Sequence, residues 1–207
     1  DYLPQYDYFL DILSLRAEPE KFRQKINRPV AALNCLQAPL EIFDALGFVP
    51  YRFCSSTVSG QDVASSRLPA LACPVIKSAL SSFLLEDSIE SLADLTVIAG
   101  TCDWMVRFPE LLEAHGGKIH FMELPHMKES ERGRKRWIEE IFLLKEFLEK
   151  ESGKMMSRSK LRLSLEKYAA ARLSLRKLLE ARERKEIPAL WCMIMTNALM
   201  MGDVEGW

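Results

Sequence analysis

Hydrophobic and polar residues follow two alternating patterns along the chain. Short apolar runs bounded by proline, glycine or polar residues are typical of buried strands, and they occupy residues 30–33, 48–53, 92–100 and 118–124. Elsewhere apolar residues recur every three or four positions, which is the period of a helix with one buried face. Helices are therefore expected over residues 4–15, 18–25, 39–46, 74–84, 104–114, 129–152, 157–185 and 189–201.

This alternation of strands and helices favours the α/β class. Strands joined by helices form a parallel sheet with right-handed crossovers, so we expect a Rossmann-like parallel sheet with flanking helices. Pro50 cannot donate a hydrogen bond to a neighbouring strand, which favours an outer position for the strand at 48–53. We expect residues 1–127 to form the α/β domain and residues 128–207 to form a helical segment.

Composition and charge exclude several classes of protein. Of the 207 residues, 48% are hydrophobic and 28% are charged, which argues against a mainly disordered chain. A net charge of −1 gives no overall attraction to nucleic acid or to an anionic membrane. No apolar run approaches the roughly 18 residues of a membrane span, and no secretory leader is recognised. We therefore expect a cytoplasmic protein that binds neither nucleic acid nor membrane.

Two of the five cysteines stand in positions suited to metal binding. Cys73 and Cys102 each precede a predicted helix, and Cys102 directly follows the most apolar strand. Helix N-termini carry partial positive charge and favour the thiolate, the form of cysteine that binds iron or zinc. We interpret these cysteines as two ligands of one metal centre, with a pair of buried thiols as the alternative.

The remaining cysteines are not predicted to be ligands. Cys35 follows the first strand and fits a core or loop position, although it lies where it could reach the same crevice. Cys54 is interpreted as a loop thiol, and Cys192 as a core residue or part of a docking surface. Asp103 fits the start of the helix after Cys102 better than it fits an acid catalyst.

An ordered set of motifs resembles the 2-hydroxyacyl-CoA dehydratase and benzoyl-CoA reductase family, over about residues 30–188. The set comprises Ala38-Pro39-Leu40-Glu41-Ile42, the segment 45–50, Cys73-Pro74 with Lys77-Ser78, Thr101-Cys102-Asp103, Leu124-Pro125-His126, Trp137 with Glu140, Gly153, Leu161 and Arg172. Each motif alone is weak, but their shared order is specific.

The resemblance implies a subunit that holds a [4Fe–4S] cluster through three cysteines and works with a homologous second subunit. In that family an ATP-hydrolysing iron–sulfur activator delivers one electron, and a ketyl radical on an acyl-CoA thioester leads to dehydration. Carried over by motif, Cys73 and Cys102 match two cluster ligands, and Glu41 matches an acidic position near the substrate. The family's third cysteine lies in a second α/β domain, which we expect to be missing from a chain that ends at Trp207.

Three alternatives remain open from the sequence. The same resemblance fits a benzoyl-CoA reductase-like subunit or a double-cubane-cluster reductase subunit. A non-catalytic α/β subunit that docks a partner through its apolar C-terminal helix is a third interpretation. The basic run from Arg132 to Arg136 is interpreted as a solvated helix face, with contact to the anionic part of coenzyme A as the alternative.

Overall fold

The computed structural model describes residues 5–53, 64–85, 88–113, 116–202 and 204–205. Its helices are α1 (Gln5–Ser14), the 3-10 turn η1 (Leu15–Ala17), α2 (Pro19–Ile26), α3 (Leu40–Ala45), α5 (Pro74–Leu84), α6 (Asp103–Glu113), α7 (Glu131–Ser152), α8 (Arg158–Glu183) and α9 (Ala189–Leu199). Its strands are β1 (Val30–Leu33), β2 (Val49–Arg52), β3 (Leu95–Ala99) and β4 (Ile119–Met122).

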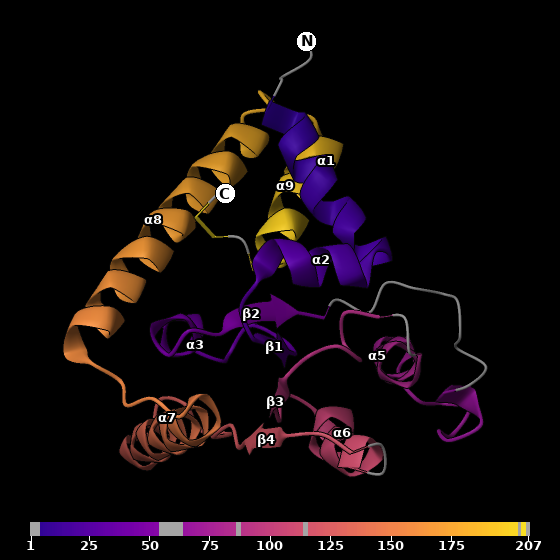
Figure 1. Ribbon diagram of the computed structural model, residues 1–207, viewed down its shortest axis with the longest axis vertical. Helices are drawn as coiled ribbons and strands as arrows, with labels where there is room; N and C mark the ends of the chain where they lie inside the picture. The colour runs from indigo at the N-terminus through magenta and orange to yellow at the C-terminus, as the bar shows by residue number, and fades with distance from the viewer. Residues whose placement is uncertain (1–4, 54–63, 86–87, 114–115, 203, 206–207) are drawn as a thin grey trace.

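The four strands form one parallel sheet in the order β2-β1-β3-β4 (Figure 1). The expected α/β fold with a parallel sheet is therefore confirmed. β2 lies at one edge, as Pro50 predicted, and pairs through Ala31↔Pro50 with β1. β3 is buried along its whole length and lies at the centre beside β1, which agrees with its uninterrupted apolar sequence.

Helices cover both faces of the sheet, and each face has its own core. On the first face α5 and α6 pack through residues such as Ile76, Leu80 and Phe108. On the second face α3 and α7 pack through Phe43, Leu144 and other buried residues. The connection through α3 runs outward from β1 to β2, whereas α5 and α6 lead the other way along the sheet. Right-handed crossovers therefore place the two sets of helices on opposite faces.

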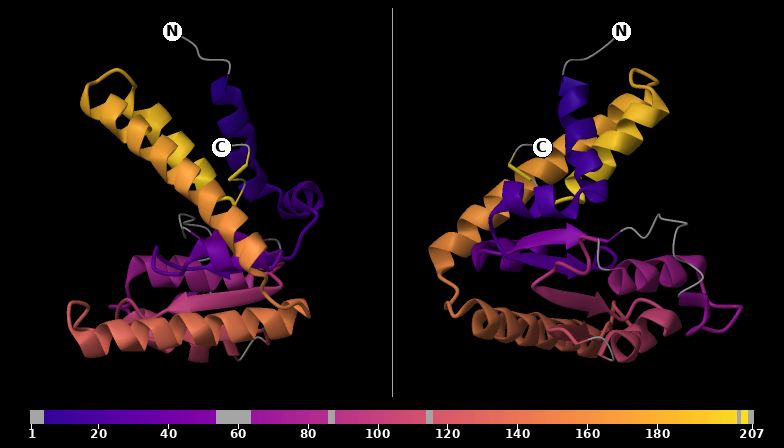
Figure 2. Two further views of the ribbon diagram at one scale, coloured as in Figure 1. Left: turned by 90° about the vertical axis from the view of Figure 1, so that its left-hand side faces the viewer. Right: turned by 45° about the vertical axis from the view of Figure 1, so that its right-hand side comes forward.

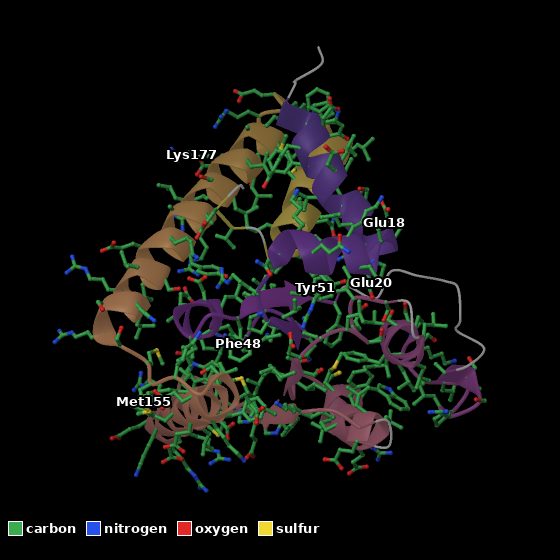
Figure 3. The ribbon with its side chains drawn as sticks, viewed as in Figure 1. Glu18, Glu20, Phe48, Tyr51, Met155 and Lys177 are labelled. Atoms are coloured by element: carbon green, nitrogen blue, oxygen red, sulfur yellow. The ribbon has the colours of Figure 1, made fainter. Side chains whose placement is uncertain are left out.

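β2 and the residues that precede it contribute side chains to both cores (Figure 3). Tyr51 belongs to the first core, where its ring meets the edge of Phe22 with centroids 5.7 Å apart and its hydroxyl donates to Glu90. Phe48 belongs to the second core. The burial of both aromatic side chains determines which side chains of β2 lie on each face of the sheet.

The remaining helices rise from the β2 side of the sheet (Figure 2). α8 and α9 lie against each other, and α9 also packs along α1 from the opposite end of the sequence. α8 is fastened to α3 by Asp44, which accepts hydrogen bonds from Lys167 at 2.6 Å and from Ser164. After α9, the Met200 carbonyl accepts a hydrogen bond from the Arg52 amide on the outer edge of β2.

The described residues do not test the predicted domain boundary or the predicted loop position of Cys54. The division between residues 1–127 and 128–207 stays a prediction, and α7 from the second part lies on the sheet of the first. Cys54 and its loop, together with His115, lie outside the described residues. Among the helices that the structure describes, none has the length and apolar character needed to cross a membrane.

Candidate functional site

The candidate site lies where β1 and β3 run side by side and their chains leave in opposite directions. In open parallel sheets such a switch point leaves a crevice at the carboxyl ends of the strands, where ligands bind. Here β1 ends at Leu33 and is followed by Asn34 and Cys35. β3 ends at Ala99 and is followed by Gly100, Thr101 and Cys102. Two of the cysteines thus follow the two central strands.

Asn34 ties these two strand ends together. Its fully buried side chain donates from Nδ2 to the Ala99 carbonyl at 3.0 Å, and its Oδ1 accepts from the Ala99 amide at 2.7 Å. The Asn34 side chain thereby supplies an acceptor for the buried Ala99 amide and a second donor for the Ala99 carbonyl, which also accepts from the Thr101 amide at 2.8 Å. Sequence reasoning did not single out this residue.

Cys35 lies beside the end of β3 and not in the core. Its Sγ is 3.2 Å from Thr101 Oγ1, and its side chain is exposed. The backbone of Cys35 has φ = 49°, a left-handed conformation that is uncommon for a residue with a Cβ. Such backbone positions are concentrated at functional sites. Cys35 thus occupies a loop position, one of the two that the sequence allowed, and its place beside Thr101 adds it to the candidate site.

Cys73 and Cys102 stand at the starts of two helices on the same face of the sheet. Cys73 is the N-cap of α5, with Pro74 as the first helical residue, and its carbonyl accepts from the Lys77 amide. Cys102 precedes α6, and its carbonyl accepts from the Val106 amide. α5 and α6 contact each other. Cys73 is half-buried against the first core, whereas Cys102 is exposed.

The donor chemistry of this region suits an iron–sulfur or zinc centre, because cysteine sulfur is the ligand that both kinds of centre use. The described residues contain no group of three or more His, Cys, Asp or Glu side chains placed to hold a metal ion. A complete ligand set is thus not formed within them. Ligation by Cys73 and Cys102 stays a prediction.

Glu41, the candidate acid–base residue, lies in the first turn of α3 next to the same edge of the sheet. Its carboxylate is paired with Arg172 of α8 at 2.6 Å, and the glutamate is buried while the arginine remains largely exposed. Below the pair lies Tyr168, whose pKa is raised by burial and further by the charges of Asp44 and Glu41. The pairing joins two residues that the sequence motifs named separately.

The Glu41–Arg172 pair borders a cavity of about 450 Å³. Its walls come from the loop 36–40 after Cys35, from α8 and from the end of α9. They are mostly apolar and include Leu36, Leu175 and Leu199. Arg52 of β2 also lines the cavity, so three charged residues lie at its wall. A hollow of this size with few charged groups suits an apolar group attached to a polar reacting centre.

The fold is that of an open α/β protein, and its candidate ligand site is the switch point of the sheet, where Cys35 lies beside Thr101. The family model for the 2-hydroxyglutaryl-CoA dehydratase D-component matches residues 35–207, and the chain belongs to that family. The match begins at Cys35 and includes Glu41, Cys73 and Cys102. No curated protein matches the chain significantly. The resemblance seen in the motifs is thus confirmed, and the chain is a subunit of the 2-hydroxyacyl-CoA dehydratase type.

Proposed function

We propose that this chain is the iron–sulfur subunit of an enzyme that dehydrates a 2-hydroxyacyl-CoA thioester by radical chemistry. The observation that carries the proposal is the position of Cys73 and Cys102 at the starts of α5 and α6, within the family match. The alternation of the fold brings both helix N-termini to the carboxyl edge of the sheet, where the substrate of such an enzyme would bind.

Cys73 and Cys102 would hold a [4Fe–4S] cluster through their thiolates. Such a cluster, when bound, supplies single electrons to the thioester carbonyl after activation by a partner that hydrolyses ATP. The first-turn N–H groups of the two helices point toward this end of α5 and α6, where they could donate to cluster sulfur. A third ligand would come from outside this pair, from Cys35, from another chain or from a bound thiol.

Glu41 has the geometry of a residue that moves the proton of the substrate hydroxyl. Its carboxylate borders the apolar cavity, and Arg172 fixes its orientation from α8. The thioester would lie with its acyl chain in the cavity and its carbonyl toward the switch point. Arg172 acts on the reaction through Glu41 and is therefore a positioning residue.

Further parts of the proposal concern the setting of the enzyme. The working protein pairs this chain with a homologous second subunit, receives electrons from an ATP-hydrolysing iron–sulfur activator and operates in the cytoplasm. Support for this setting comes from the family match alone. A reductase subunit of the same family would use the same thiols, and it differs in carrying out no elimination of water.

The cluster is tested by anaerobic reconstitution with iron and sulfide. The chain should become brown, with broad absorbance in the blue and bound iron and acid-labile sulfide. Cys73→Ser or Cys102→Ser should remove most of both, whereas the matched control Cys192→Ser, at a core position, should retain them. A chain that stays colourless, or that loses no iron in either variant, would overturn the proposal.

The role of Glu41 is tested in the assembled and activated enzyme. Glu41→Gln should lower the dehydration rate by about 10²-fold to 10⁴-fold, the range of general acid–base catalysis, while the iron content stays unchanged. Arg172→Lys should retain more activity than Arg172→Leu, because a lysine can still pair with the carboxylate. Full activity in Glu41→Gln would remove Glu41 from the mechanism.

A further inference from the structure

A groove lies over the first turns of α7, and the proposed function assigns no role to it. We propose that it binds the nucleotide end of the coenzyme A thioester, with the phosphates on Arg132, Arg134 and Lys135 and the adenine on Trp137. The inference rests on the proposed acyl-CoA substrate and extends it by assigning a site to the part of the substrate that does not react.

The groove is made of two adjoining hollows after the carboxyl end of β4. The first has a volume of about 570 Å³ and is lined by residues that include His126, Arg132 and Lys135. The second, of about 350 Å³, is lined by residues that include Arg134 and Trp137. Both hollows share the same dividing wall, formed by Leu124, Pro125 and Gly133.

The shape of this wall depends on Gly133. A Cβ at this position would lie 2.1 Å from the Met127 carbonyl oxygen, so the turn at 127–130 packs directly on the first turn of α7. The turn is held by Ser130, whose hydroxyl accepts from the Gly133 amide and donates to the Met127 carbonyl. The shape of the groove therefore depends on this backbone packing and not on the side chains alone.

Three basic side chains at the groove have no acidic partner in the described residues. Arg136 is surrounded by carboxylates, with Glu123 at 2.6 Å and Glu140 at 2.8 Å. By contrast, Arg132, Arg134 and Lys135 are exposed, and none of them has an ion pair or a side-chain hydrogen bond in the described part of the chain. This concentration of unpaired positive charge contrasts with the net charge of −1 of the whole sequence.

Unpaired arginine and lysine side chains are the groups that bind phosphate most strongly, and the N-terminus of a long helix adds partial positive charge. The nucleotide end of coenzyme A carries a pyrophosphate and a 3′-phosphate. Trp137 supplies a half-buried aromatic surface at the second hollow, with part of its ring packed against the second core. Purine bases stack on such rings.

The groove also leads to the reacting edge of the sheet. Gln37 lines both the second hollow and the cavity beside Glu41. The three hollows are therefore neighbours along the surface, from the start of α7 to the Glu41–Arg172 pair. A long ligand with phosphates at one end and an acyl group at the other fits this series in one direction only, with the phosphates over α7.

Binding is tested by titration calorimetry on the full chain with coenzyme A, adenosine 3′,5′-bisphosphate and pantetheine. We expect coenzyme A and the bisphosphate to bind and pantetheine to bind far more weakly. Replacing both Arg132 and Lys135 by Gln should weaken coenzyme A binding by about 100-fold, because each of the two charge-assisted contacts is worth about tenfold. Trp137→Leu, which keeps an apolar side chain, should also weaken it.

The matched control replaces Arg176 and Lys177 by Gln, which removes the same charge from the exposed surface of α8. Lys177 lies on the upper part of α8, far from α7 (Figure 3). This variant should bind coenzyme A as the unchanged chain does. Equal losses in both double variants, or pantetheine binding as tightly as coenzyme A, would overturn the inference.

Failure of this inference can be told apart from failure of the proposed function. Iron content after reconstitution depends on Cys73 and Cys102 and should be the same in the Arg132/Lys135 double variant. A colourless chain that still binds coenzyme A through α7 would support the groove and overturn the proposed cluster. A brown chain whose affinity for coenzyme A is unaffected by the double variant would support the cluster and overturn the groove.

Discussion

The side-chain amide of Asn34 and the backbone of Ala99 form a closed pair of hydrogen bonds across the two central strands. The pair stands where β1 and β3 end, so it determines how the loops that carry Cys35 and Thr101 meet. Asn34, which has no proposed part in the reaction, thus helps to determine the geometry of the candidate site.

Asn34→Ala should therefore destabilise the fold by about 1–3 kcal/mol, because it removes the acceptor of the buried Ala99 amide, whereas the Ala99 carbonyl keeps its hydrogen bond from the Thr101 amide. Urea unfolding followed by circular dichroism measures this difference. Asn197→Ala is the control: that amide bonds only within α9, to the Met193 carbonyl, and alanine favours helix. Equal stability of Asn34→Ala and the unchanged chain would contradict the role assigned to the pair.

The exposure of the cysteines predicts their reactivity in the metal-free, reduced chain. Cys35 and Cys102 are exposed, so each should react rapidly with a maleimide. Cys192 is buried in α9 and should react only after unfolding. Replacing Cys35 or Cys102 by Ser should each remove one fast-reacting thiol, whereas Cys192→Ser should remove none. A fast thiol lost in Cys192→Ser would show that α9 is not packed as described.

Asp44 predicts a dependence of stability on acid. Burial alone would raise the pKa of Asp44, but hydrogen bonds from Lys167 and Ser164, with help from Arg28, outweigh burial and lower it. The stabilisation is therefore complete above the unfolded-state value of about 3.9 and is lost as the pH falls through the lower folded-state pKa.

Asp44→Asn should cost about 1–3 kcal/mol at neutral pH through weaker hydrogen bonds, and its stability should change less between pH 5 and acid. Chemical unfolding at several pH values measures both effects. Asp103→Asn serves as the control, because Asp103 is exposed at the start of α6. An acid response of Asp44→Asn identical to that of the unchanged chain would exclude Asp44 as its source.

The surroundings of His120 predict a second dependence of stability on pH, closer to neutral pH than that of Asp44. Burial lowers its pKa, its ring stacks on Phe147 with centroids 4.9 Å apart, and its Nε2 is buried without a hydrogen-bond partner in the described residues. The fold thus favours neutral histidine. Stability should be constant above the unfolded-state pKa of about 6.5 and decrease as the pH falls below it, until the folded-state pKa is reached.

His120→Phe keeps the stacking and removes the titration, so its stability should vary less between pH 7.5 and 5.5. The expected slope for the unchanged chain is less than about 1.4 kcal/mol per pH unit. His126→Phe is the control, because His126 is exposed and should leave the slope intact. The prediction fails if the slope persists in His120→Phe.

Local sequence signals were sufficient for most of the fold. Pro50 predicted an edge strand, and Pro74 predicted the start of α5 after Cys73; both are confirmed. The helix predicted over residues 39–46 ends just before Gly47, which has φ = 95°. These signals work because each residue restricts its own backbone or removes its own hydrogen bond, whatever the rest of the chain does.

The contacts of the candidate site required the structure. Asn34 and Ala99 are far apart in sequence, as are Glu41 and Arg172, and no local pattern records which side chain meets which. The Glu41–Arg172 pair depends on the angle at which α8 crosses α3. The left-handed backbone of Cys35 and its contact with Thr101 are likewise features that no local pattern records.

The two borders of the sheet are unequal, with a consequence for how the protein associates. At β2, Pro50 has no amide hydrogen, and the Arg52 amide is already used by the Met200 carbonyl. At β4, no further strand pairs within the described residues. Backbone-to-backbone addition of a foreign polypeptide, whether in assembly or in misfolding, should therefore start at β4, and losing the segment after α9 would open a second place for it.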